Sequence, residues 1–193
     1  DKVFIDEKVP ADFERGITNF ITKPDLDPFA LTKFHGHNAL HYCLGLKAKE
    51  KGYAFMHQAG EESSLLKWAK ETFTEEAGPG LIAKFAYTQD ELFTQAGFLI
   101  YAEDALTRMV NPYLRDPVDR VTRDPKRKLG WNDRLMGSIR LAMRTGLFPQ
   151  RMIAVARIAL QEIMEKESLT NPAEAIDKVW SRQKDPEVIA LKK

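Results

Sequence analysis

The stretch LTKFHGHNALHYCLGLKAKEK, residues 31–51, decides the fold that we predict for this chain. Apolar side chains recur along it at helical spacing, including Phe34 and Leu40, so it predicts one long helix. The lysines near its end and Gly52 directly after it are typical of a helix C-terminus. The same stretch begins with a strongly polar segment, residues 33–41, which makes it the first place to look for a functional site.

The remainder of the chain continues the helical pattern. Gly78-Pro79-Gly80 is predicted to stop the helix before it, because glycine and proline break regular structure. Thr88, with Glu91 three residues on, matches the capping box that begins a helix. Residues 113–133 are rich in turn formers and cations, so we place them on loops and short helices. The further predicted helices span residues 61–76, 88–110, 133–145 and 150–166, and a short one follows Asn171-Pro172.

Together these segments predict an all-α fold, with six or more helices around one core. No alternation of apolar and polar residues is long enough to indicate a strand, and no repeat or low-complexity segment is present. We predict a single helical domain over residues 1–193. It comprises a leading segment (1–28), a core (29–166) and a C-terminal helical tail (167–193).

The composition excludes several classes of protein. With 29 Lys and Arg against 28 Asp and Glu, the formal net charge is +1, which gives no electrostatic case for a nucleic-acid binder. No apolar run reaches the ~18 residues that a membrane span needs. Cys43, the one cysteine, is predicted to be a small apolar core residue. The lack of a disulfide framework favours a reducing, cytoplasmic location.

Three histidines in the polar segment allow a metal site as one hypothesis. His37 and His41 are four residues apart and share one face of a helix, a spacing that zinc accepts. With His35, and with Glu61 or Glu62 as a further ligand, they would form the centre of a helical metal hydrolase. Nothing in the sequence fixes that further ligand.

Proton transfer is a second hypothesis for the same segment. Asn38 and His41 are three residues apart and share a helical face, and the long side chain of Lys33 can reach the same point. An amine, an amide and an imidazole that converge on one ligand can move a proton and stabilise a developing oxyanion. A third and plainer interpretation is a polar helix end on the surface.

The spacing Lys-x4-Asn-x2-His, formed by Lys33, Asn38 and His41, resembles the signature of the polyol-specific long-chain dehydrogenases. The residues that follow, 44–59, resemble the next part of that family's pattern. Gln58 is a departure, because the family usually has Glu there.

A second and longer stretch supports the same family. Residues 111–129, NPYLRDPVDRVTRDPKRKL, together with NDRL at 132–135, resemble the mannitol-1-phosphate 5-dehydrogenase branch. The resemblance covers roughly residues 29–160 and implies the C-terminal, substrate-binding domain of such an enzyme.

This resemblance implies metal-independent oxidation of a secondary alcohol of a polyol, with hydride passed to NAD. It makes Lys33 the general acid/base, Asn38 a hydrogen-bond donor to the reacting oxygen, and His41 a residue that holds that oxygen or a neighbouring hydroxyl. A free lysine has a pKa of about 10.4, so the site must lower it through burial or nearby cations such as Arg120 and Lys128.

The cationic run is expected to decide the substrate. Arg120 and Lys128 match substrate-orienting positions of the family. Arg123, Arg127 and Arg134 are candidates for a phosphate clamp, since guanidinium groups pair with phosphate through two parallel hydrogen bonds. The implied reaction is the interconversion of mannitol 1-phosphate and fructose 6-phosphate.

Other interpretations of the cationic run remain open. One alternative places the cations on a solvated loop, and another has them bind the carboxylate of a sugar acid, as in a tagaturonate or fructuronate reductase of the same family. A mannitol 2-dehydrogenase and a non-catalytic sugar-phosphate-binding module are further alternatives.

The sequence contains no strand–Gly-x-Gly-x-x-Gly–helix unit, which a Rossmann nucleotide-binding domain would need. We therefore expect NAD to bind mainly to a Rossmann domain outside this chain. The chain itself is expected to be a trimmed or excised segment of the enzyme. The chain alone is expected to have no dehydrogenase activity, and turnover of mannitol 1-phosphate by it would contradict that expectation.

Overall fold

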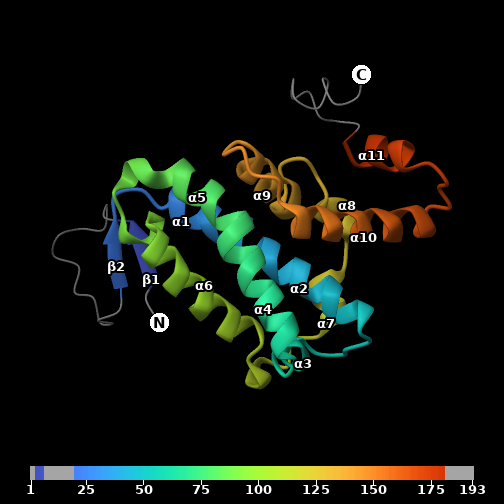
Figure 1. The fold of residues 1–193 in the computed structure, drawn as a ribbon, viewed down its shortest axis with the longest axis horizontal. Coiled ribbons are helices and arrows are strands. Elements are labelled where there is room, and N and C mark those ends of the chain that lie inside the picture. Colours follow the sequence, from blue (N-terminus) through green and yellow to red (C-terminus); the bar gives the residue numbers. More distant parts are fainter. Residues whose placement is uncertain (1–2, 7–19, 181–193) are drawn as a thin grey trace.

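The computed structural model of the chain describes residues 3–6 and 20–180. This part is overwhelmingly helical, which confirms the predicted all-α fold. The exception is a parallel pair of four-residue strands, β1 (Val3–Asp6) and β2 (Phe20–Lys23), in which Phe4 aligns with Ile21. Strands this short leave no recognisable alternation in the sequence. They lie at one end of the molecule (Figure 1), where the Phe4 ring packs 4.6 Å from that of Phe29 in the first helix.

The helices differ widely in length. They are α1 (Asp27–Thr32), α2 (Asn38–Glu50), α3 (Met56–Gly60), α4 (Ser63–Glu71), α5 (Gly78–Phe85), α6 (Gln95–Met109), α7 (Val118–Thr122), α8 (Pro125–Lys128), α9 (Arg134–Met143), α10 (Gln150–Lys166) and α11 (Pro172–Trp180). Two π-helical segments, η1 (Lys33–His37) and η2 (Thr72–Ala77), join α1 to α2 and α4 to α5. Short 3₁₀ turns are η3 (Ala86–Thr88), η4 (Glu91–Phe93) and η5 (Pro112–Leu114).

Helix α2 forms the centre of the core. It packs against α3, α4, α7, α9 and α10, and most of its residues are buried. Cys43 is fully buried among them, as predicted. A helix that is apolar on nearly all sides belongs in the interior, so the stretch that opened the sequence analysis organises the helices around it.

The helix that includes α4 does not stop at Gly78-Pro79-Gly80, contrary to the prediction. It continues through η2 into α5, and the backbone N–H of Gly78 bonds to the carbonyl of Phe73, five residues back. Pro79 has no N–H to donate, and its ring would clash with the carbonyl four residues before it in a regular α-helix. The wider π turn accommodates the proline without ending the helix.

Gly80 lies where the continuous helix packs closely against α9. A Cβ at Gly80 would lie 2.6 Å from the backbone carbonyl carbon of Leu141 in α9. Any side chain at this position would therefore push α5 and α9 apart. The two glycines that suggested a helix stop instead allow close helix packing.

The predicted cap at Thr88 is also wrong. Thr88 ends the 3₁₀ turn η3, and the following helix, α6, begins seven residues later. Thr94 caps α6 instead, because its side-chain oxygen accepts a hydrogen bond from the backbone N–H of Gly97 at 3.0 Å. The predicted ends of the helices near Gly52, Val110 and Gly146 are confirmed, as are the starts of α10 and α11.

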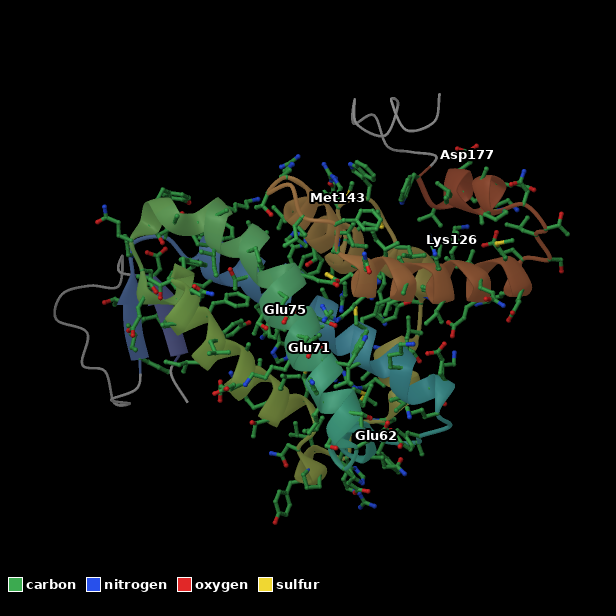
Figure 2. The ribbon with its side chains drawn as sticks, viewed as in Figure 1. Glu62, Glu71, Glu75, Lys126, Met143 and Asp177 are labelled. Carbon is green, nitrogen blue, oxygen red and sulfur yellow. The ribbon has the colours of Figure 1, made fainter. Side chains whose placement is uncertain are left out.

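A side chain from the η2 segment caps the N-terminus of helix α10. The buried carboxylate of Glu76 accepts hydrogen bonds from the backbone N–H groups of Arg151 and Met152, both at 2.9 Å. Negative charge at a helix N-terminus is stabilising. The Arg151 side chain also pairs with Glu71 and Glu75, which follow one another along the same helix (Figure 2). The π turn thus positions the group that fixes the start of α10.

Replacing Gly80 with alanine should destabilise the fold. We expect the free energy of unfolding to fall by about 1–3 kcal/mol, because the new methyl group overpacks the α5–α9 contact. Urea denaturation measures the change. Ala83→Ser, an exposed position on the same helix, serves as control and should stay within about 0.5 kcal/mol of the parent. Equal stability of the G80A variant and the parent would contradict this packing.

Candidate active site

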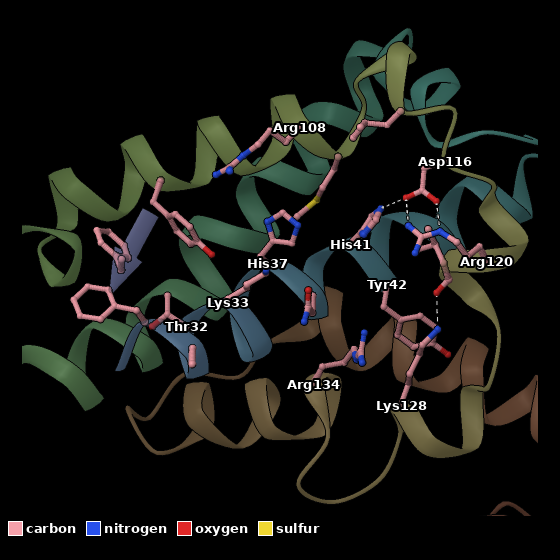
Figure 3. Close-up of a pocket in the computed structure, with 18 of the residues that line it drawn as sticks. Thr32, Lys33, His37, His41, Tyr42, Arg108, Asp116, Arg120, Lys128 and Arg134 are labelled. Carbon is pink, nitrogen blue, oxygen red and sulfur yellow. Dashed lines mark hydrogen bonds and ion pairs between the residues drawn. The ribbon is translucent and has the colours of Figure 1, made fainter. Parts of the chain in front are cut away.

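All the residues that the sequence analysis proposed for the catalytic and substrate-binding site line one pocket of about 910 Å³. Its lining comes from α1–η1–α2, which run through the middle of the view, from α6 on one side of them and from the segments α7 to α9 on the other (Figure 3). The predicted residues in its lining are Lys33, Asn38, His41, Arg120, Arg123, Arg127, Lys128 and Arg134. The polar helix end is therefore part of a pocket wall, and its plain surface interpretation is not supported.

The π turn η1 brings Lys33 and Asn38 together. The backbone N–H of Asn38 bonds to the carbonyl of Lys33, five residues back, so the two residues lie one above the other along the axis. On an ideal α-helix they would point in different directions. The Lys33 side chain is exposed, and its amine has no hydrogen-bond or ion-pair partner within residues 3–6 and 20–180. Its amine is therefore available to a ligand.

His41 lies beside a carboxylate that the sequence analysis did not single out. Its Nε2 atom is 3.3 Å from Oδ2 of Asp116, but makes no hydrogen bond within the described part of the chain. The Asp116 carboxylate, which is buried, accepts two hydrogen bonds of 2.6 Å from the Arg120 guanidinium (Figure 3). Asp116 thus compensates the charge of Arg120, so Arg120 contributes less positive charge to the pocket than the sequence suggests.

Lys128 is the most deeply buried cation of the pocket, with 3% of its surface exposed. Its ammonium donates hydrogen bonds to the carbonyls of Val121 and Arg123 and lies 4.7 Å from the centre of the Tyr42 ring. Burial, reinforced by the positive charges of Arg134 and Arg127, lowers the pKa of Lys128 to about 8. Near neutral pH this amine therefore loses its proton far more readily than an exposed lysine does.

The three arginines proposed as a clamp differ in their surroundings. Arg127 is half exposed and pairs with Asp124 and Asp133. Arg134 is only 19% exposed, pairs with Asp133 through Nε, and lies over the Phe34 ring. The Arg123 side chain is exposed at the pocket. Arg134 is therefore the best placed of the three to meet a ligand in a partly desolvated setting.

The lining is strongly cationic overall. It holds seven Lys and Arg side chains against one carboxylate, Asp116. The seven are Lys33, Arg108, Arg120, Arg123, Arg127, Lys128 and Arg134. A concave surface with this charge balance attracts anions.

Two further residues of the lining, His37 and Arg108, were not predicted as part of this site. Arg108 reaches the pocket from α6 and pairs with Asp104 (Figure 3). His37 lies close enough to Lys33 and Arg108 for both to act on it. Burial, with the charges of His41, Arg108 and Lys33, lowers the pKa of His37 to about 4. The position of Arg108 on α6, far along the chain, left no local signal in the sequence.

The described residues do not bring the ligands of the metal-site hypothesis together. The rings of His37 and His41 are 6.1 Å apart and face the pocket, whereas His35 packs against Gly137 of α9. Glu62 is paired with Lys51 instead. Among the described residues no cluster of three His, Cys, Asp or Glu side chains could hold a metal ion.

The family model of the mannitol dehydrogenase C-terminal domain matches residues 25–193. The chain belongs to this family. It is 32% identical over 125 residues to mannitol-1-phosphate 5-dehydrogenase of Caldanaerobacter subterraneus subsp. tengcongensis, a match that covers 65% of this chain and 31% of that protein. The enzyme of the same name from Lactiplantibacillus plantarum is 32% identical over 116 residues, or 60% and 28% of the two chains.

A longer match, to the mannitol-1-phosphate 5-dehydrogenase of Halalkalibacterium halodurans, is 28% identical over 144 residues and covers 73% of this chain and 36% of that protein. The chain thus spans about a third of the length of the curated relatives that it matches. In the described part of this family member, no helix is both long and apolar enough to span a bilayer.

The two pocket histidines should make this domain sensitive to mild acid. Burial lowers the pKa values of His37 and His41 from 6.5 to about 4. Between these values the unfolded chain binds protons that the folded chain does not, so the free energy of unfolding should fall as the pH drops from 6.5 to 4. Each histidine contributes up to about 3 kcal/mol. Urea denaturation across this range measures the slope.

The His37→Gln and His41→Gln variants identify the source of that slope. Each should flatten the dependence of stability on pH, and the double variant should flatten it most. An unchanged slope in the double variant would show that other groups cause the acid sensitivity.

Proposed function

We propose that this chain is the substrate-binding and proton-transferring domain of an NAD-dependent oxidoreductase that interconverts mannitol 1-phosphate and fructose 6-phosphate. The observation that carries the proposal is the pocket itself, which combines Lys33, Asn38 and His41 with an excess of cations. The names of the relatives agree with this substrate.

The proposed chemistry assigns one role to each residue of the polar helix end. In oxidation the carbinol carbon loses a hydride to the nicotinamide, and the hydroxyl loses its proton to the Lys33 amine; reduction reverses both transfers. Asn38 donates a hydrogen bond to the reacting oxygen as negative charge develops on it. His41 hydrogen-bonds that oxygen or the neighbouring hydroxyl through Nε2, an atom that has no hydrogen-bond partner among the described residues.

Lys33 can act as a base only as a neutral amine, which requires burial or nearby cations. Its side chain is exposed in this chain. We propose that the nucleotide-binding domain covers this side of the pocket and supplies the burial. The described residues contain only the two short strands β1 and β2, with no strand–helix–strand crossover of the Rossmann type. NAD would therefore be held mainly outside this chain.

The phosphate end of the substrate is assigned to the part of the pocket lined by α8 and α9. Arg134 and Lys128 lie there, partly or almost fully desolvated, and the exposed Arg123 and Arg127 also line the pocket. Hydrogen bonds between charged partners are stronger in such a setting than in water. Arg120, already bound to Asp116, is assigned to orienting the substrate hydroxyls.

A sugar-acid reductase is the second candidate function, because the same cations could bind a carboxylate. The two differ in the geometry of the anion: a phosphate offers three oxygens to several arginines, whereas a carboxylate offers two. A free-polyol dehydrogenase does not need the excess of cations. A binding module without catalysis would use the cations but not Lys33.

Calorimetric titration of the chain with fructose 6-phosphate, mannitol 1-phosphate, mannitol and fructuronate tests the substrate. We expect the two phosphates to bind most tightly. Arg134→Ala should weaken their binding about 10- to 100-fold, since a charged hydrogen bond contributes roughly 1.5–3 kcal/mol. Arg157→Ala, which removes an exposed arginine of α10 outside the pocket, is the matched control and should bind like the parent.

Two results would change the proposal. Tighter binding of mannitol than of its phosphate would exclude the phosphate clamp. Tighter binding of fructuronate would favour the sugar-acid reductase.

A further inference from the structure

The C-terminal helix α11 is docked on the segment that carries Lys128. The Nε1 atom of Trp180, in the last turn of α11, donates a hydrogen bond of 2.8 Å to the carbonyl of Leu129. The Trp180 ring also meets the buried Trp131 edge to face, at 5.0 Å between centroids. Residues 129 and 131 lie just beyond the C-terminal end of α8, so one tryptophan of the tail contacts the chain at two points directly after this short helix.

An ion-pair cluster joins the same two elements at another point. Glu167, just after α10, pairs with Lys126 of α8 at 3.0 Å and with Lys178 of α11 at 3.5 Å. Exposed pairs of this kind contribute little individually. Together with the Trp180 hydrogen bond, however, they tie α11 to α8 at two separate places.

These contacts bear on Lys128 because it lies next to the residue that Trp180 holds. The backbone N–H of Leu129 bonds to the carbonyl of Pro125 and closes α8, while its carbonyl accepts from Trp180. Leu129 itself is buried. The backbone of Lys128 is therefore fixed from one side by the tail and from the other by the turn of α8, and its ammonium points back into the pocket wall.

We propose that α11 is a positioning element of the anion pocket: through Trp180 it holds the α8 turn so that the Lys128 ammonium stays buried against Tyr42. Trp180 is a positioning residue, because it acts through Leu129 and does not line the pocket. The link to substrate binding rests on the proposed function, whereas the effect on Lys128 does not.

The experiment follows the titration of Lys128 by NMR of its side-chain carbon, assigned with Lys128→Arg, in the full 193-residue chain. In the parent, burial lowers the pKa of this lysine to about 8. We expect Trp180→Ala to raise it toward the ordinary value, because the α8 turn is released and the amine gains water. The amide of Leu129 should exchange at least about tenfold faster, because it loses protection when the local structure opens.

Other groups around Lys128 could also move its titration, so they must be kept in view. The charged and titratable groups that face it are Arg123, Asp124 and Arg127 on its own segment, Arg134 on α9, and Tyr42 and His41 on α2. None of these is changed by the substitutions at Trp180, which makes a shift attributable to the position of the turn.

Two variants control for general destabilisation. Trp180→Phe keeps an aromatic ring next to Trp131 but loses the N–H donor and part of the ring contact, so it should shift the Lys128 titration in the same direction but less. Ala173→Ser changes an exposed residue of α11 outside the Trp180 contacts and the ion-pair cluster, and should leave Lys128 unchanged. An unchanged Lys128 titration and Leu129 exchange in folded W180A and W180F would overturn the proposal.

Titration with inorganic phosphate and fructose 6-phosphate then separates this inference from the proposed function. We expect W180A to bind both about tenfold more weakly. A released Lys128 with unaltered phosphate affinity would confirm the positioning role and overturn the assignment of this wall to the phosphate group.

Discussion

The burial of α2 is the constraint on which the rest of the structure depends. Because α2 packs against five other helices, the elements around it are fixed relative to its polar beginning. Two of them, α7 and α9, carry Arg120 and Arg134 into the pocket. The π turn at the start of α2 then adds one residue to the helix and aligns Lys33 with Asn38. Core packing and site geometry are thus consequences of the same stretch.

The cations around this helix would repel one another if nothing compensated them. Asp116 binds Arg120, backbone carbonyls bind the ammonium of Lys128, and Asp133 is shared by Arg127 and Arg134. Among the described residues, Asp116 is the one carboxylate of the pocket lining, against seven Lys and Arg side chains, so the lining keeps an excess of positive charge. A bound anion would complete the charge balance, and this links the packing of the domain to the class of ligand that we propose.

The sequence predicted much of this arrangement, for reasons that are local. Helical spacing located α2 and α10, and the two motifs identified every residue proposed for the site, although their roles remain proposals. The predictions that failed depended on contacts between segments far apart in the sequence. Gly78-Pro79-Gly80 indicates a helix stop in isolation, but the close approach of α9 and the π turn carry the helix through it. Asp116 is four residues from Arg120, a spacing that allows their pairing, but its position beside His41, like that of Arg108 in the pocket, depends on contacts between distant segments.

The most direct test of the central claim is a crystal structure of the chain with fructose 6-phosphate bound. The account predicts the phosphate within hydrogen-bonding distance of Arg134, beside Lys128, and the ketone oxygen within reach of Lys33 and Asn38. A phosphate bound beside Arg108 and His37, or a ligand outside this pocket, would contradict it.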